Sequence, residues 1–548
     1  MIRRGAALVL ALVIACGTDD PSNVDATATQ LPPAPTKPSD EQRARADALL
    51  TGPDWYRHAV FYEVNVRSFA DSNGDGIGDL DGVVSKLDYL KELGVDALWL
   101  MPIYPSPFVD SGYDISDYRT VDPIYGGMPA FETLIREAHA RKMRVLMDLV
   151  LNHTSDEHPW FTESRADKTN AKADWYVWSD TAGREDIGTC NSGNPMFGES
   201  WTLDALRNQY FFHRYYAGQP DLNYRSPAVV AETLDTVRFW LEDKGLDGYR
   251  CDVIGQLYES ANACSMIPET VDYIKQMRGV LNRLPDRVML AESSLLGETA
   301  PYYGNGSDMF HMAFEFEYGY TWSFAFASGN KKLVEGSLGK TIGYAKGSQP
   351  AQVIGSHDVA RAWQSAAGEA WKVRNATLLQ MTMRGTPFIY YGDELGMRPG
   401  KQVVVDSRDS ARTPMTWTAN EAGHGFTTGT PWIAFGEAPE ATAVDAQDRD
   451  LDSMLTFYRR LLAFRRGRAV WGAGTLDIVT TDNAQMVTFT RALDGERYLV
   501  AVNLTDQDQV AAPAAGAIGP AHLVFGEGEV RDDTVRVPAA SAAIFELR

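Results

Sequence analysis

The chain has little cysteine, a deficit of basic residues and an N-terminal apolar run too short to cross a membrane. Each shortage excludes a class of protein. Four cysteines in 548 residues are too few for a fold framed by disulfides. A total of 51 Lys and Arg against 73 Asp and Glu gives a formal net charge of -22, which disfavours a nucleic-acid partner because nucleic acids bind basic surfaces. With this negative charge, a neutral or cationic ligand is expected instead. Hydrophobic residues make up 44% of the chain, so we expect a large globular protein.

The N-terminal residues predict export. In "MIRRGAALVLALVIAC" two arginines precede an apolar run at 6–15, which is shorter than the ~20 residues needed to span a bilayer and is typical of a signal peptide over residues 1–16. Its end, "VIAC", resembles the lipobox of bacterial lipoproteins, which implies that Cys16 is acylated and anchors the protein to the cell envelope, periplasmic or at the cell surface. An ordinary signal peptide with a chance cysteine is the alternative. Residues 17–50, rich in Pro, Thr, Ala and Asp, predict a flexible tether.

From residue 51 to 469, short apolar runs that end in polar residues alternate with helical patterns. The runs are "AVFYEVNV", "ALWLMP", "RVLMDLVLNH", "GYRCDVIG", "RVMLAESS", "AQVIGSHD" and "PFIYYGDE", with a weaker one near "MAFEFEY". Strands that alternate with helices indicate a parallel sheet buried on both faces, and eight of them predict an α/β fold of the TIM (β/α)8 barrel type. A doubly wound open sheet is the alternative, but no Gly-rich phosphate loop follows the first strand.

Two regions break this alternation. Residues 153–219, rich in Trp, Asn and Gly, are too long for a bare loop and predict an inserted subdomain after the third strand. From about residue 470 to 548 the pattern alternates in the manner of strands, with turn signals "TDN" and "LDGE", which predicts a C-terminal antiparallel β-sandwich domain. In an oxidising compartment Cys190 and Cys264 are the expected disulfide, and Cys251 is expected to be a buried free thiol.

Polar side chains at the ends of the predicted strands converge on one face of such a barrel. They are Asp148, Asn152, His153, Arg250, Asp252, Glu292, His357 and Asp358. Carboxylates in this setting suit hydrolysis of a glycosidic bond, in which one acts as the nucleophile and another as the protonated acid. Arg250 and Asp252 share one strand face, so we expect Arg250 to keep Asp252 ionised for attack. Salt bridges at the barrel mouth or metal ligands are the alternative interpretation of these charges.

The stretches "DLVLNH", "GYRCDVIG", "AESS" and "GSHDVAR" resemble the four conserved regions of glycoside hydrolase family 13, the α-amylase family. "QPDLN" resembles the additional motif of the oligo-1,6-glucosidase subgroup, and the likeness extends from about Trp55 to the C-terminus. The resemblance implies a nucleophile at Asp252, a general acid/base at Glu292 and a third carboxylate at Asp358. It also implies contacts with the sugar at subsite −1 from His153, Arg250, His357 and the stacking residue Tyr113.

Further details of the resemblance concern the substrate. Two positions depart from the family pattern: Ser356 in "GSHD", where Asn is usual, and the residues after the acid in "AESS". In exo-acting α-glucosidases of the subgroup, the Asp that matches Asp114 pairs with the Arg of "ARTPM", here Arg412, and closes the site into a pocket. Val253, after the nucleophile, goes with α-1,6 bonds in this family.

The loop "DSNGDGIGD" after the first strand spaces oxygen ligands in the manner of a calcium site. The candidate ligands are Asp71, Asn73, Asp75, the carbonyl of Ile77, and Asp79. The family places a calcium-type ion in this loop, so we expect structural Ca2+ here and no organic cofactor. An ordinary Asx-rich turn is the alternative, because the closing Glu of an EF-hand is missing.

The leading interpretation is a retaining, exo-acting glycosidase that hydrolyses short α-1,6- and α-1,4-linked gluco-oligosaccharides, and we expect it to be a monomer. Trehalose synthase, which the chain also resembles, and an endo-acting α-amylase are the enzymatic alternatives. A non-catalytic sugar-binding relative is the alternative from another class. Export favours a hydrolase that scavenges oligosaccharides, since trehalose synthase acts on cytoplasmic maltose.

Overall fold

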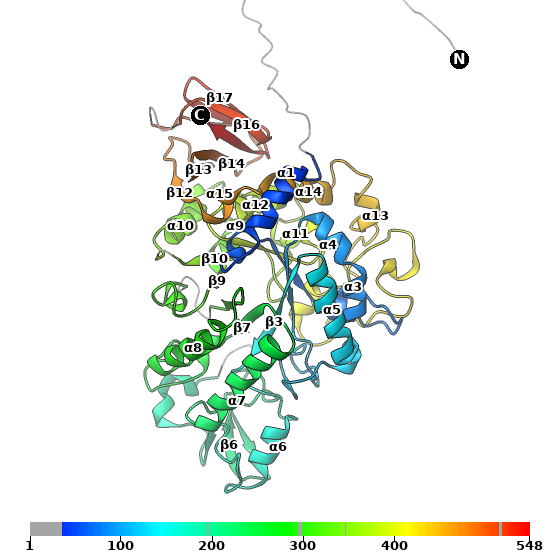
Figure 1. Cartoon of the computed structure of the whole chain (residues 1–548), viewed down its shortest axis with the longest axis vertical. Coiled ribbons are helices and arrows are strands. Elements are labelled where there is room, and N and C mark those ends of the chain that lie inside the picture. The colour runs from blue at the N-terminus through cyan, green and yellow to red at the C-terminus, as the bar shows by residue number, and fades with distance from the viewer. Residues whose placement is uncertain (1–34, 194–196, 294–298, 346, 515–517) are drawn as a thin grey trace, which may run out of the picture.

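The computed structural model describes residues 35–193, 197–293, 299–345, 347–514 and 518–548 (Figure 1). Its centre is a closed barrel of eight parallel strands in the order β1-β11-β10-β9-β8-β7-β3-β2. This confirms the predicted TIM barrel, including the weak eighth strand near "MAFEFEY", which is β9. The barrel strands are β1 (Phe61–Val64), β2 (Ala97–Leu100), β3 (Arg144–Val150), β7 (Gly248–Asp252), β8 (Val288–Ala291), β9 (Met312–Glu315), β10 (Gln349–Gln352) and β11 (Thr386–Tyr390).

Helices cover the outside of the barrel because its strands are apolar on both faces. All strand residues except Arg144 are buried. The helices of the barrel and its connections are α2 (Val66–Phe69), α3 (Leu80–Ser85), α4 (Leu87–Leu93), α5 (Gly127–Ala140), α7 (Pro227–Arg238), α8 (Pro268–Leu281), α9 (Phe316–Ser328), α10 (Lys331–Ile342), α11 (Ala362–Ser365), α12 (Ala370–Thr382), α13 (Val444–Gln447), α14 (Met454–Arg465) and α15 (Ala469–Ala473).

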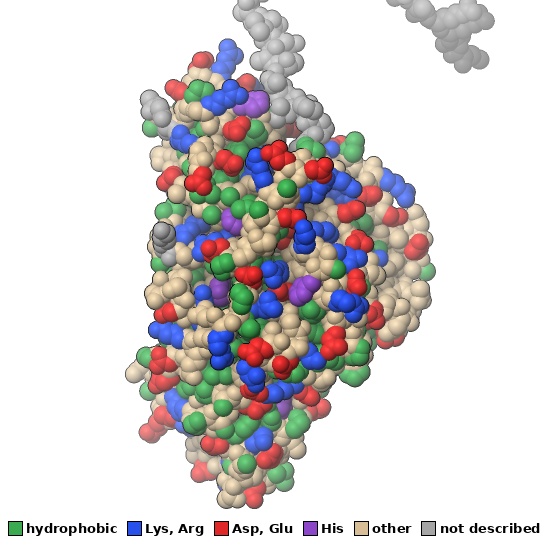
Figure 2. Space-filling view, in the orientation of Figure 1, with side chains coloured by type: hydrophobic (Ala, Val, Ile, Leu, Met, Phe, Trp, Pro, Cys, Tyr) green, Lys and Arg blue, Asp and Glu red, His purple; other side chains and the backbone are tan. Residues whose placement is uncertain are grey.

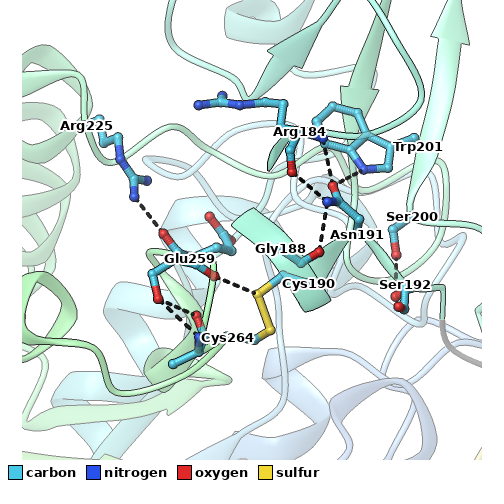
Figure 3. The surroundings of a disulfide bond; sticks show 12 residues. Arg184, Gly188, Cys190, Asn191, Ser192, Ser200, Trp201, Arg225, Glu259 and Cys264 are labelled. Atoms are coloured by element: carbon cyan, nitrogen blue, oxygen red, sulfur yellow. Dashed lines mark hydrogen bonds between the residues drawn. A yellow bond between two sulfur atoms is a disulfide. The ribbon is translucent and has the colours of Figure 1, made fainter. Parts of the chain in front are cut away.

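The insertion between β3 and β7 forms a small subdomain of its own. It contains α6 (Pro159–Ala166) and a three-stranded sheet, ordered β4-β6-β5, from β4 (Trp178–Ser179), β5 (Trp201–Asp204) and β6 (Gln209–Phe212). The predicted disulfide is confirmed: Cys190, in the insertion, is bonded to Cys264 in the connection after β7 (Figure 3). Cys251 is a buried free thiol, as expected. The disulfide therefore joins the subdomain to the loop that follows Asp252.

The C-terminal domain confirms the predicted antiparallel architecture. One sheet has the order β12-β13-β14-β19-β16 and the other β15-β18-β17. Apolar residues of both sheets share one core, for example Leu499 and Val535, so the two sheets pack as a sandwich. The turn "LDGE" joins β13 to β14 with positive φ at Asp494 and Gly495, as a tight hairpin requires. The strands are β12 (Thr475–Ile478), β13 (Met486–Leu493), β14 (Glu496–Asn503), β15 (Gln509–Ala511), β16 (Ala521–Gly526), β17 (Glu529–Arg531), β18 (Thr534–Val537) and β19 (Ala542–Leu547).

The predicted tether over residues 17–50 is wrong at its C-terminal end, where helix α1 (Asp40–Leu49) forms. Ser39 and Gln42 make a capping box, and the Gln42 side chain donates to the carbonyl of Ala463 on α14. Local capping and one contact with the barrel therefore order a segment whose composition suggests none. Residues 1–34, which include the predicted signal peptide and Cys16, lie outside the described residues. In the described part of the chain no helix is long and apolar enough to cross a membrane.

The surface carries charges of both signs. Figure 2 shows acidic and basic side chains interspersed over the face drawn, from the C-terminal domain to the inserted subdomain. Many of them pair, as in the contacts of Arg119 with Glu232 and Asp235. On this face the charges of the two signs are therefore mixed, and the face drawn defines no binding site by its charge.

Candidate active site

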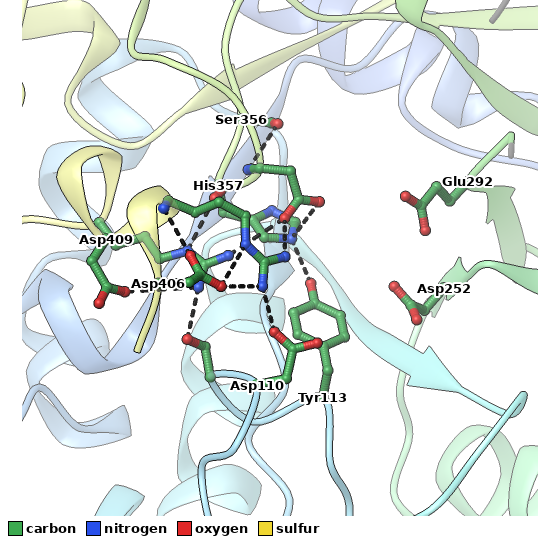
Figure 4. Close-up of polar contacts among 12 residues, drawn as sticks. Asp110, Tyr113, Asp252, Glu292, Ser356, His357, Asp406 and Asp409 are labelled. Atoms are coloured by element: carbon green, nitrogen blue, oxygen red, sulfur yellow. Dashed lines mark hydrogen bonds and ion pairs between the residues drawn. The ribbon is translucent and has the colours of Figure 1, made fainter. Parts of the chain in front are cut away.

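A cavity of about 330 Å³ opens at the C-terminal ends of the barrel strands. The side chains that line it include all three carboxylates predicted for catalysis, together with Tyr113, His153 and His357. In a (β/α)8 barrel the strand ends face one mouth, so residues up to 298 positions apart meet there. The carboxylates are Asp252, Glu292 and Asp358, and Figure 4 shows that the first two lie side by side, opposite His357.

Arg250 is the centre of the charged network. Its Nη1 donates to Asp252 Oδ1 at 2.7 Å and to Asp148 Oδ1 at 2.6 Å, and its Nη2 lies 2.9 Å from Glu292 Oε2. The arginine is buried, and its guanidinium lies over the ring of Trp99. One guanidinium therefore fixes the positions of two neighbouring carboxylates of the cavity and of a third beneath them.

Three carboxylates against one guanidinium cannot all be ionised without cost. Burial raises the pKa of Asp252 well above its usual value; Arg250 lowers it, and Glu292, Asp148 and Asp358 raise it further. Burial also raises the pKa of Asp148, against the effect of Arg250. The expectation that Arg250 keeps Asp252 ionised is therefore not supported, because burial and the neighbouring carboxylates outweigh the effect of Arg250 on the pKa of Asp252. Arg250 favours the ionised form of the carboxylates it contacts.

Asp358 lies in a more cationic part of the cavity. Its Oδ1 is 3.0 Å from Arg408 Nη1 and 3.4 Å from Arg412 Nη2, and its Oδ2 is 3.2 Å from His357 Nε2. Burial raises the pKa of Asp358, but His357 and the guanidinium groups outweigh it, so the pKa falls well below its usual range. The two sides of the cavity thus differ: the pKa of Asp252 is raised, whereas the pKa of Asp358 is lowered, which favours its anion.

His357 is held from two sides by buried partners. Its Nδ1 faces Glu63 Oε1, on the first barrel strand, and its Nε2 lies 2.7 Å from Tyr113 Oη. The Tyr113 ring stacks on the His357 ring with centroids 5.5 Å apart, and its hydroxyl also donates to Asp148. Tyr113 lines the cavity beside His357, and its role as the −1 platform stays a prediction. Glu63, which sequence reasoning missed, orients the histidine.

Glu292 is positioned by the residue that follows Asp252. The backbone N–H of Val253 donates to Glu292 Oε2 at 2.9 Å. Val253 itself has φ 36°, which is strained for a β-branched residue. Strain of this kind persists where the surrounding structure imposes it.

His153 also lines the cavity and is buried. Burial lowers its pKa to about 4, so the imidazole is neutral at pH 7. Gln219, from the "QPDLN" motif, lies between His153 Nε2, at 3.1 Å, and Asp110 Oδ2, at 3.2 Å. The subgroup motif thus connects two walls of the cavity.

The predicted pair of Asp114 and Arg412 does not form. The Asp114 carboxylate accepts from the N–H groups of Val109 and Asp110 and is fully buried within its own loop. Arg412 donates to the His357 carbonyl and to Ser111. The pair that lines the cavity is Asp110 and Arg408, with Oδ1 and Nη2 2.6 Å apart.

The correct residues are in the same two motifs, "DSGYD" and "RDSAR", four positions before those predicted. Each motif contains two residues of the required type, and only the geometry of the loops decides which acid pairs with which arginine. Arg408 also binds Asp406 and Asp358, so one arginine joins three acidic side chains beside the cavity.

The departure at Ser356 has a local role. Its hydroxyl accepts from the backbone N–H of Asp358 at 3.2 Å, which helps to hold the loop that carries Asp358 (Figure 4). In "AESS", Ser293 donates to the carbonyl of Phe314, and Ser294 lies outside the described residues. Neither departure removes a carboxylate from the cavity.

Aromatic and amide side chains that the sequence did not single out form the rest of the wall. Tyr215 donates to Gln256 at 2.9 Å, and the ring of Phe197 packs edge-on against Tyr215. Phe316 and Tyr320 of α9 also line the cavity. Aromatic residues are common in cores, so only their placement at the mouth distinguishes them.

The predicted calcium loop folds as a series of Asx turns. Asp71 accepts from the N–H groups of Asn73, Gly74 and Gly76 and from the Thr427 hydroxyl, and these bonds outweigh burial and lower its pKa. The oxygen donors suit Ca2+ in kind, but each oxygen of Asp71 already accepts two hydrogen bonds. Among the described residues, however, no three His, Cys, Asp or Glu side chains converge as a metal site. The calcium ion stays a prediction.

A closed (β/α)8 barrel with paired carboxylates and an arginine at its mouth defines the glycosidase class. The family model for the α-amylase catalytic domain matches residues 63–473. The chain therefore belongs to the α-amylase family of glycosidases, and the resemblance inferred from its four motifs is confirmed.

Relatives within the family have different activities. The chain is 34% identical over 529 residues to an oligo-1,6-glucosidase of Parageobacillus thermoglucosidasius, covering 83% of this chain and 91% of the relative. It is 35% identical over 517 residues to a trehalose synthase of Thermus thermophilus, covering 83% of this chain but only 51% of that protein. The solved structure of the α-glucosyl transfer enzyme XgtA superimposes with a TM-score of 0.82 at 33% identity, covering 90% of this chain and 100% of that one. Hydrolase, isomerase and transferase names are thus similarly close.

Proposed function

We propose that the protein is a retaining, exo-acting α-glucosidase that releases glucose from the non-reducing ends of short α-1,6- and α-1,4-linked gluco-oligosaccharides. The observation that carries this proposal is the contact of Arg408 with both Asp110 and Asp358, which closes one end of the cavity. A sugar chain cannot pass a wall of paired charges, so only a terminal glucose fits on that side of the cleaved bond. The open side accepts the leaving group.

In the proposed mechanism Asp252 attacks the anomeric carbon and Glu292 gives its proton to the glycosidic oxygen. The leaving group departs as an alcohol, and a covalent glucosyl–Asp252 intermediate forms. Glu292, now ionised, takes a proton from water, which attacks the same carbon and restores both carboxyl groups. Arg250 contacts both residues, so the guanidinium holds the reacting carboxyls in register throughout.

The contacts support these roles. Glu292 lines the cavity, and the Val253 N–H that it accepts orients its carboxyl group. Asp358 is held as an anion by His357, Arg408 and Arg412. An anion at that point can bind the sugar hydroxyl groups next to the reacting carbon and stabilise the positive charge that develops in the transition state.

Three further expectations belong to the same proposal. Val253 beside the nucleophile supports action on α-1,6 bonds, on the family resemblance. A cavity built from one chain is compatible with a monomer. Export and anchoring through Cys16 rest on the N-terminal residues, and Cys16→Ser should release the protein from membranes; unchanged membrane fractionation would contradict the anchor.

Product analysis tests the function. The purified protein is incubated with maltose, isomaltose, trehalose, sucrose and starch, with Asp252→Ala as the control, and products are followed by chromatography and by the anomeric NMR signal. Glucose released first as the α-anomer from the disaccharides, with slow action on starch, is the expected result. Rapid internal cutting of starch would contradict the closed pocket.

Trehalose synthase is the second candidate, favoured by the similarity to the Thermus thermophilus enzyme. An isomerase has to keep the released glucose in the site until it is relinked. Trehalose as the main product from maltose, with little free glucose, would establish this activity in place of hydrolysis.

A further inference from the structure

Helix α9 carries a row of aromatic side chains on one face. Phe316, Tyr320 and Phe324 are four residues apart, so they lie above one another on the helix surface. The ring centroids of Phe316 and Tyr320 are 5.9 Å apart. Tyr320 is 42% exposed and Phe324 is 67% exposed, and they are the aromatic members among the exposed large apolar side chains of the described residues.

Core packing does not explain this row. The buried side of α9 is a different face, formed by Tyr318, Trp322, Ala325 and Phe326. A surface helix normally presents polar side chains to solvent, and adjacent exposed aromatic rings are costly unless they bind something. The outer face of α9 is therefore a candidate binding surface.

The row begins inside the active-site cavity and runs along its rim. Phe316 and Tyr320 line the cavity together with Glu292, and Phe324 is the next step of the row. Further along α9, Trp322 Nε1 donates to the carbonyl of Ile354, which lies just beyond the C-terminal end of β10. The helix thus stays level with the barrel mouth instead of descending the outer wall.

We propose that Tyr320 and Phe324 bind the sugar rings on the leaving-group side of the substrate, beyond the unit joined to the cleaved bond. This inference rests on the proposed exo-glucosidase function. In the proposed function the ion pair of Arg408 and Asp110 closes one end, so the remainder of an oligosaccharide leaves past the other lining residues, which include Phe316 and Tyr320. The ligand is an α-linked gluco-oligosaccharide longer than a disaccharide.

The spacing and chemistry of the row fit such a ligand. Four residues of helix advance about 6 Å, which is comparable with the length of one pyranose unit. The carbon-bound hydrogens on one face of a glucose ring pack against an aromatic face, while its hydroxyl groups stay in water at an exposed site. Each stacking contact is expected to be worth about twofold to tenfold in kcat/KM.

The test measures kcat/KM for the di-, tri- and tetrasaccharide of whichever linkage series the protein hydrolyses, in wild type, Tyr320→Ala and Phe324→Ala. The readout is the ratio between successive lengths, which a general loss of activity would not change. We expect kcat/KM to rise with length in wild type. Tyr320→Ala should lower the trisaccharide-to-disaccharide ratio, and Phe324→Ala the tetrasaccharide-to-trisaccharide ratio. Phe324→Tyr should keep the tetrasaccharide-to-trisaccharide ratio of wild type.

Val510→Ala is the matched control, because Val510 is exposed but lies in the C-terminal domain. Ratios that are equal in wild type and Phe324→Ala would overturn the inference. The inference would also be overturned if Phe324→Ala left the ratios unchanged but lost self-association in sedimentation or lost binding to lipid vesicles. If no glucose is released from any α-glucoside, the proposed function fails; calorimetric titration with maltotetraose then decides the inference separately, and equal affinity for wild type and Phe324→Ala would overturn it.

Discussion

Glu292→Gln separates the acid role of Glu292 from its structural role. The glutamine carbonyl can still accept from Val253 N–H and from Arg250, both now 2.9 Å from Glu292 Oε2, so the site should keep its shape. Only the transferable proton is lost. General acid catalysis contributes about 10²–10⁴-fold, so hydrolysis of maltose or isomaltose should fall by that factor. A glucoside with 2,4-dinitrophenol as the leaving group needs no protonation, and its first step should remain fast.

The assay is stopped-flow release of dinitrophenol. Because Glu292 also activates water in the second step, the variant should show a burst followed by slow turnover. Azide, which needs no base, should speed the slow phase and yield the α-glucosyl azide. Thermal unfolding of the variant serves as the control for folding. An equal loss on the disaccharide and on the dinitrophenyl glucoside, without a burst, would refute the assignment of Glu292 as the acid.

Four other predictions follow from the contacts. Asp252→Ala should lose at least about 10⁴-fold in kcat with its melting temperature largely retained, since no neighbouring oxygen can replace the nucleophile; activity near that of the parent would contradict the role. Arg408→Ala should lower kcat/KM for disaccharides about 10²-fold, because two charge-assisted contacts at the closed end are lost, and an unchanged value would argue against a closed pocket. Burial raises the pKa of Asp247, but His139, the Val145 N–H and Arg144 outweigh this and leave it below its usual value. Its ionised form therefore stabilises the fold above the unfolded pKa of about 4, and this contribution is lost as the pH falls through the lower folded pKa. Asp247→Asn should thus cost about 3–5 kcal/mol in urea unfolding at pH 7 and progressively less below pH 4; a cost independent of pH would contradict it. Removing calcium with a chelator should lower the melting temperature more than kcat, and an unchanged melting temperature would show that the loop at 71–79 is an ordinary turn.

The sequence by itself determined the barrel and the residues at its mouth. Strands such as "GYRCDVIG" are apolar on both faces and end in charged residues, a pattern that only a parallel sheet covered by helices satisfies. The C-terminal ends of such strands meet, so the motifs that contain Asp252, Glu292 and Asp358 had to converge. Even the disulfide between Cys190 and Cys264 followed from the few cysteines present.

Sequence composition failed where local contacts override it. Residues 40–49 looked like tether, yet the Ser39 and Gln42 capping box and the bond from Gln42 to α14 order them as a helix. These contacts depend on the position of α14 in the fold, which the composition of residues 40–49 does not indicate.

Only the tertiary structure decided which acid and which arginine of two short motifs enter the pocket. Asp110 and Asp114 are separated by a turn in which Ser111 and Gly112 have positive φ, so the two carboxylates point to different places. Asp114 accepts hydrogen bonds from the backbone of its own loop, whereas Asp110 contacts Arg408, which is 298 residues away in the chain. Likewise Glu63 meets His357 only because the first and seventh strands of a closed barrel face the same interior. The direction of a loop side chain is set by backbone torsions and distant partners, and neither can be read from residue spacing.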